Sequence, residues 1–114
     1  MAFQEFAQHF LLQPQTRLNF QEGNSLYQQL TAILPERYQL WVIDMTHVDF
    51  IDSSGLCALV RGLKLARNQG CRLVICNLQA TARLIFDITQ LDQAFEIFDS
   101  FDDISSPQAE LLIA

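Results

Sequence analysis

The chain has 114 residues, half of them apolar, and carries a net charge of -6 from 13 acidic and 7 basic residues. This length and apolar content predict a single domain over residues 1–114 with its own hydrophobic core, and they exclude a disordered chain. An acidic surface repels phosphate backbones and anionic lipids, so nucleic acid and membrane surfaces are poor candidate partners.

The N-terminus and the cysteines indicate the cellular compartment. The segment from Met1 to Glu5 has no basic stretch followed by an apolar one, so we see no secretory signal, and no apolar run approaches the roughly 20 residues that cross a bilayer. Three cysteines, an odd number, argue against a disulfide framework and for a reducing compartment. We therefore expect a cytoplasmic protein.

The first twenty residues predict extended chain. Residues 5–13 and 16–20 have the composition of strands and are separated by Pro14. Neither segment alternates cleanly between apolar and polar residues.

The next segment predicts a helix over residues 24–34. Asn24 or Ser25 is suited to cap its N-terminus, and Pro35 ends it. Its apolar positions recur at helical spacing and form one stripe: Leu26, Leu30, Ile33 and Leu34.

Two short apolar runs, residues 40–44 and 73–76, predict buried strands. A helix lies between them and stops at Gly70 in the usual way. Its apolar face follows the spacing i, i+3, i+4, i+7, at Leu56, Leu59, Val60 and Leu63.

The last third of the chain predicts a helix over residues 79–88, with Ala82, Ile85 and Phe86 facing inward, and a strand over residues 95–98. Pro107 is well placed in the first turn of a final helix that runs through Leu111, Leu112 and Ile113.

Helices thus alternate with near-continuous apolar strands from residue 24 onward. Such strands are buried on both faces, and the crossover helices between them require parallel pairing. The pattern predicts an α/β fold with a small central sheet. Functional loops of such sheets lie beyond the carboxyl ends of the strands, and residues 44–54 leave the strand at 40–44 in this way.

The most informative segment of that loop runs from Asp52 through two serines into the helix. A helix start exposes backbone N–H groups, so it accepts side-chain oxygens or phosphate readily. This corner is therefore able to present Ser53 at the surface and carry a phosphate without unfolding. The alternative is that Ser53 or Ser54 merely caps the helix.

Catalysis by this corner finds little support. Ser53 or Ser54 as a nucleophile needs a base, for which His47 is the nearest histidine, but no Gly-x-Ser-x-Gly elbow surrounds either serine. We expect no enzyme and no cofactor.

A metal or phosphoryl-acceptor site is equally poorly supported. Asp44, Asp49 and Asp52 resemble the acids of a receiver domain, but such a domain needs a lysine after its last strand, and the last lysine here is Lys64, inside a helix. The cysteines do not have metal-ligand spacing, and we expect them to be buried thiols: Cys57, Cys71 and Cys76.

The residues from Phe50 to Leu56, together with the apolar strands at 42–45 and 73–76 around them, resemble the STAS domain of bacterial anti-sigma factor antagonists. The segment from Arg83 to Asp92 is similar to that family's helix before the last strand. The resemblance covers roughly residues 16 to 104. It implies the STAS fold, with a small mixed central β-sheet of about four to five strands and about four α-helices.

The resemblance also implies a function. In that family the first serine after the aspartate is phosphorylated by an anti-sigma factor that doubles as a serine kinase, and a PP2C-type phosphatase reverses the modification. The unmodified antagonist sequesters the anti-sigma factor and so releases a sigma factor. Carried over, Ser53 is the acceptor, and the partner-binding residues are expected at Asn19, Asp52, Ser53, Ser54, Gly55, Leu56, Arg61 and Lys64.

Two further expectations accompany this assignment. The family's Gly-Glu-Leu-Asp is replaced by Thr16-Arg17-Leu18-Asn19, which lowers the local negative charge and changes the affinity or identity of the partner. We expect a monomer or weak dimer. The alternative function is a STAS scaffold or interaction module that never cycles through phosphorylation.

Overall fold

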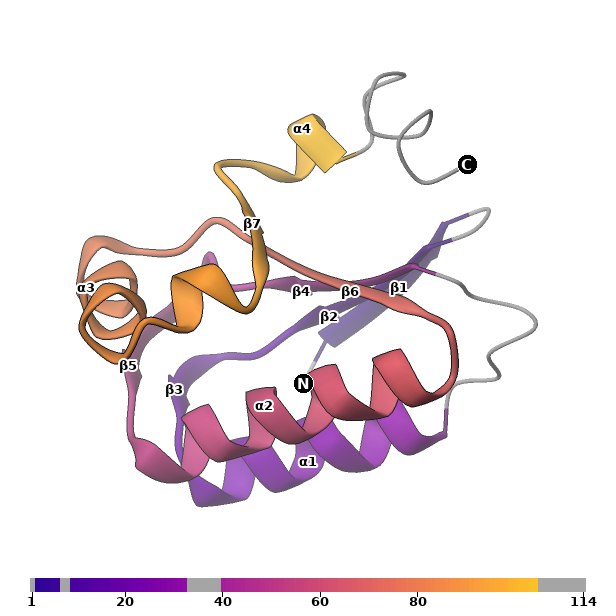
Figure 1. Ribbon diagram of the computed structural model, residues 1–114, viewed down its shortest axis with the longest axis horizontal. Coiled ribbons are helices and arrows are strands. Elements are labelled where there is room, and N and C mark those ends of the chain that lie inside the picture. The colour runs from indigo at the N-terminus through magenta and orange to yellow at the C-terminus, as the bar shows by residue number, and fades with distance from the viewer. Residues whose placement is uncertain (1, 7–8, 33–39, 105–114) are drawn as a thin grey trace.

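A five-stranded sheet runs through the middle of the computed structural model, which describes residues 2–6, 9–32 and 40–104 (Figure 1). Strand β1 pairs antiparallel with β2, and the other neighbours pair in parallel. The α/β class and the small mixed sheet are therefore confirmed. Across the sheet the order is β1 (Ala2–Phe6), β2 (His9–Gln13), β4 (Leu40–Asp44), β6 (Arg72–Cys76) and β7 (Glu96–Phe98).

Helices cover both faces of this sheet. Figure 1 shows α1 and α2 side by side under one face, α3 at one end, and the short α4 over the other face. The helical elements are α1 (Phe20–Thr31), α2 (Ser53–Asn68), α3 (Ala80–Thr89), the 3-10 helix η1 (Leu91–Gln93) and α4 (Phe101–Ile104).

A second, two-stranded parallel sheet joins β3 (Thr16–Leu18) to β5 (Val48–Ile51). Strand β5 lies within residues 44–54, which the sequence predicted as a loop after the strand at 40–44, so that prediction is wrong for residues 48–51. Val48 and Ile51 are buried and the two residues between them are exposed. A pattern this short does not identify a strand, because its pairing partner lies about thirty residues earlier in the chain.

The beginning of the first helix also differs from prediction. Helix α1 starts at Phe20, and Asn19 caps it by accepting the Glu22 N–H at 3.1 Å, so neither Asn24 nor Ser25 is the cap. An N-cap with an acid three residues later overrides the extended character of residues 16–20. The predicted end of this helix, at residues 33–35, lies outside the described residues.

Two other boundaries need correction. Residues 5–13 are not one strand, because β1 ends at Phe6 and β2 begins at His9 as its antiparallel neighbour. Helix α4 was not predicted, and the helix expected from Pro107 to Ile113 lies outside the described residues.

Apolar side chains fill both sides of the sheet. The larger core lies between the sheet and the helices α1, α2 and α3, and it includes Trp41, Leu59 and Phe86. A smaller cluster on the other face is covered by Ile104 of α4. This second cluster contains Leu11, Leu40, Val42, Val74, Cys76 and Ile104.

Candidate functional site

The ends of β3 and β5 meet at one corner of the molecule. The two strands run parallel, and each leads directly into a helix, β3 into α1 and β5 into α2 (Figure 1). The N-termini of α1 and α2 therefore lie next to each other at this corner. This brings Asn19 close to the serine turn, although Asn19 and Asp52 are 33 positions apart in the sequence.

Asp52, and not a serine, caps helix α2. Its Oδ1 accepts the Gly55 N–H at 2.9 Å. The alternative that Ser53 or Ser54 caps the helix is wrong, because the carboxylate of Asp52 already accepts the Gly55 N–H. Ser53 is then the first helical residue and is exposed, whereas Ser54 is half-buried.

Gly55 fastens the start of α2 to strand β3. A Cβ atom at this position would lie 2.0 Å from the Leu18 carbonyl oxygen. That same oxygen accepts the Asp52 N–H at 3.3 Å. Only a residue without a side chain permits this approach. Gly55 therefore determines how close the start of α2, and with it Ser53, lies to strand β3. Leu56, the next residue, is half-buried and packs against the main core.

A shallow groove of about 250 Å³ begins beside Ser53 and follows the seam between α1 and α2. Its floor includes Ala58, and the helices approach closely there, since a Cβ at Gly23 would lie 2.8 Å from the Ala58 Cβ. The lining residues are Phe20, Asn24, Ser53, Ser54, Cys57, Ala58 and Arg61.

Aromatic rings hold two arginines near the corner. The Arg61 guanidinium lies 4.1 Å from the centre of the Tyr27 ring, and that of Arg17 lies 5.8 Å from the centre of the Phe50 ring. Such stacking orients a cation without neutralising its charge. Lys64 is exposed on α2 beyond Arg61 and is not among the described residues that line the groove.

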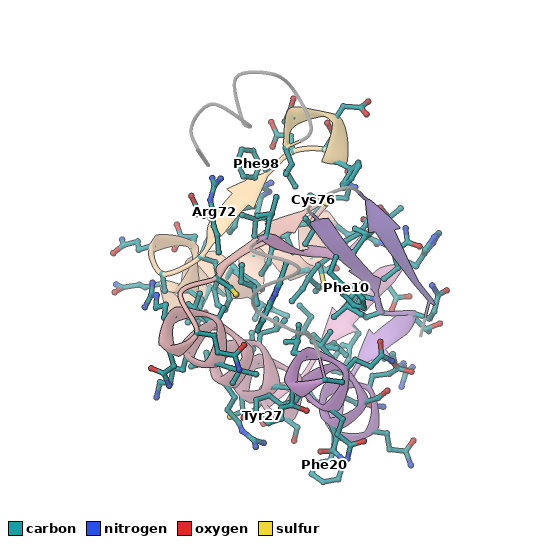
Figure 2. The ribbon with its side chains drawn as sticks, turned by 90° about the vertical axis from the view of Figure 1, so that its right-hand side faces the viewer. Phe10, Phe20, Tyr27, Arg72, Cys76 and Phe98 are labelled. Atoms are coloured by element: carbon teal, nitrogen blue, oxygen red, sulfur yellow. The ribbon has the colours of Figure 1, made fainter. Side chains whose placement is uncertain are left out.

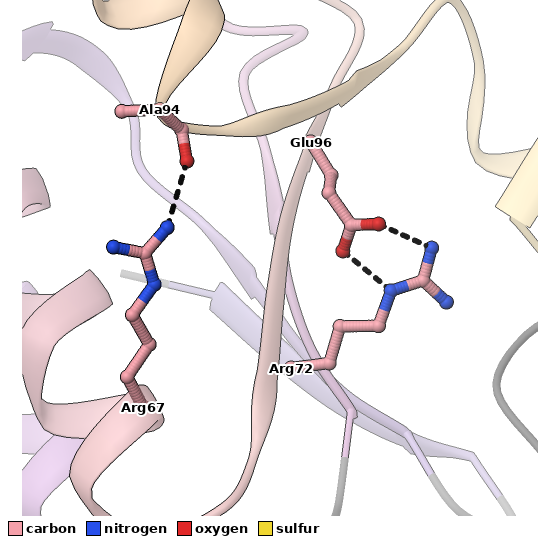
Figure 3. Close-up of polar contacts among 4 residues, drawn as sticks. All are labelled: Arg67, Arg72, Ala94 and Glu96. Carbon is pink, nitrogen blue, oxygen red and sulfur yellow. Dashed lines mark hydrogen bonds and ion pairs between the residues drawn. The ribbon is translucent and has the colours of Figure 1, made fainter.

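Arg67 lies apart from this group. Its Nη2 donates to the Ala94 carbonyl at 3.2 Å, beside the bidentate pair of Arg72 and Glu96 at the far end of α2 (Figure 3). Arg61 and Lys64 thus lie together on one stretch of α2, whereas Arg67 is directed toward β7.

The three aspartates of the β4–α2 segment have separate structural tasks. Asp44 is buried, Asp49 is exposed and its carbonyl accepts from Thr81 Oγ1, and Asp52 is the cap. Within residues 2–6, 9–32 and 40–104, no group of three His, Cys, Asp or Glu side chains is arranged to hold a metal ion. His47 is exposed, and its carbonyl accepts the Thr16 N–H at 2.8 Å.

Asp44 ties together the carboxyl ends of three parallel strands. It accepts hydrogen bonds from Gln13 of β2 at 2.9 Å, from the Thr46 N–H at 3.0 Å, and from Asn77 after β6 at 2.9 Å. Burial by itself would raise the pKa of Asp44, but these bonds, with that of the Thr46 hydroxyl, outweigh it and lower the pKa. This anchors the loop that leads to β5 and the serine corner.

The cysteines fall into two classes. Cys71 and Cys76 are buried as predicted, and burial together with the neighbouring Asp44 charge raises the pKa of Cys76 to about 12. The prediction is wrong for Cys57, which is exposed and lines the groove one helical turn after Ser53.

Side chains of α1 contribute to the site, and this contribution was not predicted. Phe20, Asn24 and Tyr27 belong to it, and Phe20 is 70% exposed, projecting from the start of the helix (Figure 2). The signal was the pair Asn19 and Glu22, which has the spacing of a helix N-terminus.

Comparisons with known proteins agree with this architecture. Residues 2–104 match the family model of the STAS domain. The crystal structure of a putative anti-sigma factor antagonist from Thermotoga maritima superposes with a TM-score of 0.81 at 19% identity, covering 90% of this chain and 88% of that one. A sulfate transporter family protein from Wolinella succinogenes gives 0.80 at 19% identity, over 92% and 87% of the two chains.

A third similar structure is the anti-sigma factor antagonist SpoIIAA in its unphosphorylated form. Its TM-score is 0.69 at 16% identity, covering 98% of this chain and 97% of that one. At these identities the three structures show a shared fold and no more. Among the described residues of this chain, none of the helices has the length and apolar character needed to span a membrane.

Proposed function

The chain belongs to the STAS domain family, and from this premise we propose that it is an anti-sigma factor antagonist switched by phosphorylation of Ser53. In this proposal the unmodified protein sequesters an anti-sigma factor with serine kinase activity and so releases a sigma factor. A PP2C-type phosphatase returns the phosphorylated form to the active one. The protein acts in the cytoplasm as a monomer or weak dimer, without a cofactor.

One observation carries the proposal: Ser53 is exposed as the first residue of α2, while Asp52 supplies the cap. The hydroxyl is therefore not required by the fold and is open to a kinase. Because a helix N-terminus favours an anion by several tenths of a kcal/mol, a phosphate there leaves α2 folded. The switch then acts on binding and not on folding.

The binding free energy lost on phosphorylation is large enough to release the partner. Phosphorylation adds about -1.5 to -2 charges at neutral pH. A partner surface shaped for a hydroxyl would have to desolvate that dianion beside Asp52. Leaving a buried charge unpaired costs about 3–5 kcal/mol, whereas a hundredfold loss of affinity needs only about 2.7 kcal/mol.

The groove beside Ser53 suits the rest of such an interface. It combines the exposed aromatic ring of Phe20, the small side chain of Ala58 on its floor, and the Arg61 guanidinium stacked on Tyr27. Arg61 and Lys64 would steer a partner whose facing surface is acidic. Arg17 and Asn19 stand where the family motif has acids. They make this corner more positive, which also favours an acidic partner surface.

The test is phosphorylation followed by binding. We expect candidate anti-sigma factor kinases from the same genome, incubated with ATP and the full chain, to add one phosphate by intact-mass measurement. Ser53→Ala should abolish the addition, and Ser100→Ala, a control at a serine outside this corner, should retain it. No mass increase with any such kinase would contradict the proposal.

Calorimetry then tests the switch itself. Ser53→Asp should bind the kinase at least tenfold more weakly than the wild type, with an unchanged circular dichroism spectrum. Equal affinities of the two proteins would reject the switch.

A second function is favoured by the similarity to a sulfate transporter family protein. In that case the domain is an interaction module that binds its partner without cycling through phosphorylation. It predicts stable partner binding that is insensitive to ATP, the kinase and Ser53→Ala.

A further inference from the structure

Helix α3 exposes an apolar pair on its outer side. Leu84 is 58% exposed and Ile88, one helical turn later, is 71% exposed. Ala82 and Phe86, on the opposite side of the same helix, are fully buried. The inner side of α3 therefore meets the core, and the outer side presents two large aliphatic side chains to water.

A cation and an anion lie beside this apolar pair, on one flank of α3. Arg83 precedes Leu84 and Asp87 precedes Ile88, so the two charged residues are also one turn apart, and both are exposed. Arg83 Nη2 lies 3.4 Å from Asp99 Oδ1 at an exposed position, where an ion pair contributes little. The other flank carries Thr81 and Thr89, which donate to the Asp49 and Ile85 carbonyls.

The order of these four residues is self-complementary. If two copies of α3 meet antiparallel about a twofold axis, every contact of residue i with residue j is repeated as j with i. Leu84 of each copy then packs on Ile88 of the other, and Arg83 of each copy meets Asp87 of the other. A parallel pairing about a twofold axis would instead set the flank of Arg83 and Asp87 against the threonine flank of the other copy, without charge pairing.

We propose that the outer side of α3 is a self-association surface through which two copies of this chain form an antiparallel, twofold-symmetric dimer. The dimer is weak, because one pair of three-turn helices buries less than a standard protein interface and because two chains of charge -6 repel each other. It does not depend on the proposed function, since the Ser53 corner is built from α1, α2, β3 and β5.

Sedimentation equilibrium of the full chain over two decades of concentration tests this surface. We expect a reversible monomer–dimer equilibrium that Leu84→Asp weakens by about tenfold or more. The matched control is Gln28→Asp, which adds the same charge at an exposed position of α1 and should leave the equilibrium almost unchanged. A chain that stays monomeric throughout, or a dimer indifferent to Leu84→Asp, would overturn the proposal.

Charge exchange tests the antiparallel arrangement. Arg83→Asp alone and Asp87→Arg alone should each weaken the dimer several-fold, because each places like charges opposite one another. The double variant restores opposite charges and should regain affinity close to that of the wild type. Failure of the double variant to recover, with its circular dichroism spectrum intact, would refute the arrangement.

Discussion

Asp44 shows how a single buried charge organises one edge of the sheet. No guanidinium or ammonium group takes part in the hydrogen bonds described for it; its donors are the Gln13 and Asn77 amides and the backbone and hydroxyl of Thr46. Neutral donors from β2, from the residue after β6 and from the loop after β4 thus replace the water that burial removes. The carboxylate joins segments that the sequence separates by about thirty residues.

This arrangement makes stability depend on pH. Because the pKa of folded Asp44 lies below 3.8, the unfolded chain binds more protons in acid than the native one. The contribution of Asp44 to the free energy of unfolding is therefore present above that value and is lost as the pH falls through the folded pKa. In urea denaturation from pH 7 to pH 3, we expect Asp44→Asn to be about 1–3 kcal/mol less stable at pH 7 and to lose less stability on acidification.

The control for that series is Asp92→Asn, which removes one charge from an exposed position in η1. Its curve should run parallel to that of the wild type. If Asp44→Asn also ran parallel, Asp44 would not be the titrating group.

At the scale of elements, the start of α2 depends on a close contact with strand β3. The contact requires glycine at position 55, because any Cβ there would overlap the Leu18 carbonyl. Gly70, at the other end of α2, is needed for a different reason: its φ of 72° is left-handed, while the space around it is open. The glycines at the start of α2 and just after its end thus serve packing and backbone conformation respectively.

These roles predict unequal costs for the same added methyl group. Gly55→Ala should lower the free energy of unfolding by about 3 kcal/mol, because backbone must move to admit the Cβ. Gly70→Ala should cost only about 1 kcal/mol, from left-handed strain. Guanidinium denaturation of both variants measures the difference, and equal losses would contradict the packing argument.

For the whole molecule, the sheet needs apolar cover on both faces. Figure 2 places Phe98 and Cys76 toward α4 and Phe10 on the side of the larger core. Ile104, in a helix of only four residues, is fully buried against the smaller cluster. A short element therefore completes one of the two layers that enclose the sheet.

Removal of that contact should affect the entire fold. We expect Ile104→Ala to lower the free energy of unfolding by about 2–5 kcal/mol, because it leaves a cavity over the sheet. Ile88→Ala, measured in dilute solution, is the matched control, and at 71% exposure it should change stability by less than about 0.5 kcal/mol. Similar losses in the two variants would show that α4 adds little to the core.

Elements whose apolar residues form a pattern over a few neighbouring positions could be predicted from the amino-acid sequence. Strands β4 and β6 are continuous apolar runs, and α2 and α3 carry apolar residues at helical spacing, so their existence and the α/β class followed from periodicity. The STAS resemblance of the segment around Ser53 followed from a contiguous motif. Both kinds of signal depend on neighbours within a few residues.

Features that depend on contacts between distant segments became visible only in the folded chain. Strand β5 exists because β3 pairs with it, and Gly55 brings the start of α2 against the Leu18 carbonyl. The groove formed because α1 lies beside α2, which placed the Tyr27 ring under the Arg61 guanidinium and put the exposed Cys57 in its lining. Pairing and packing between segments far apart in sequence leave no local pattern, and therefore only the folded chain reveals them.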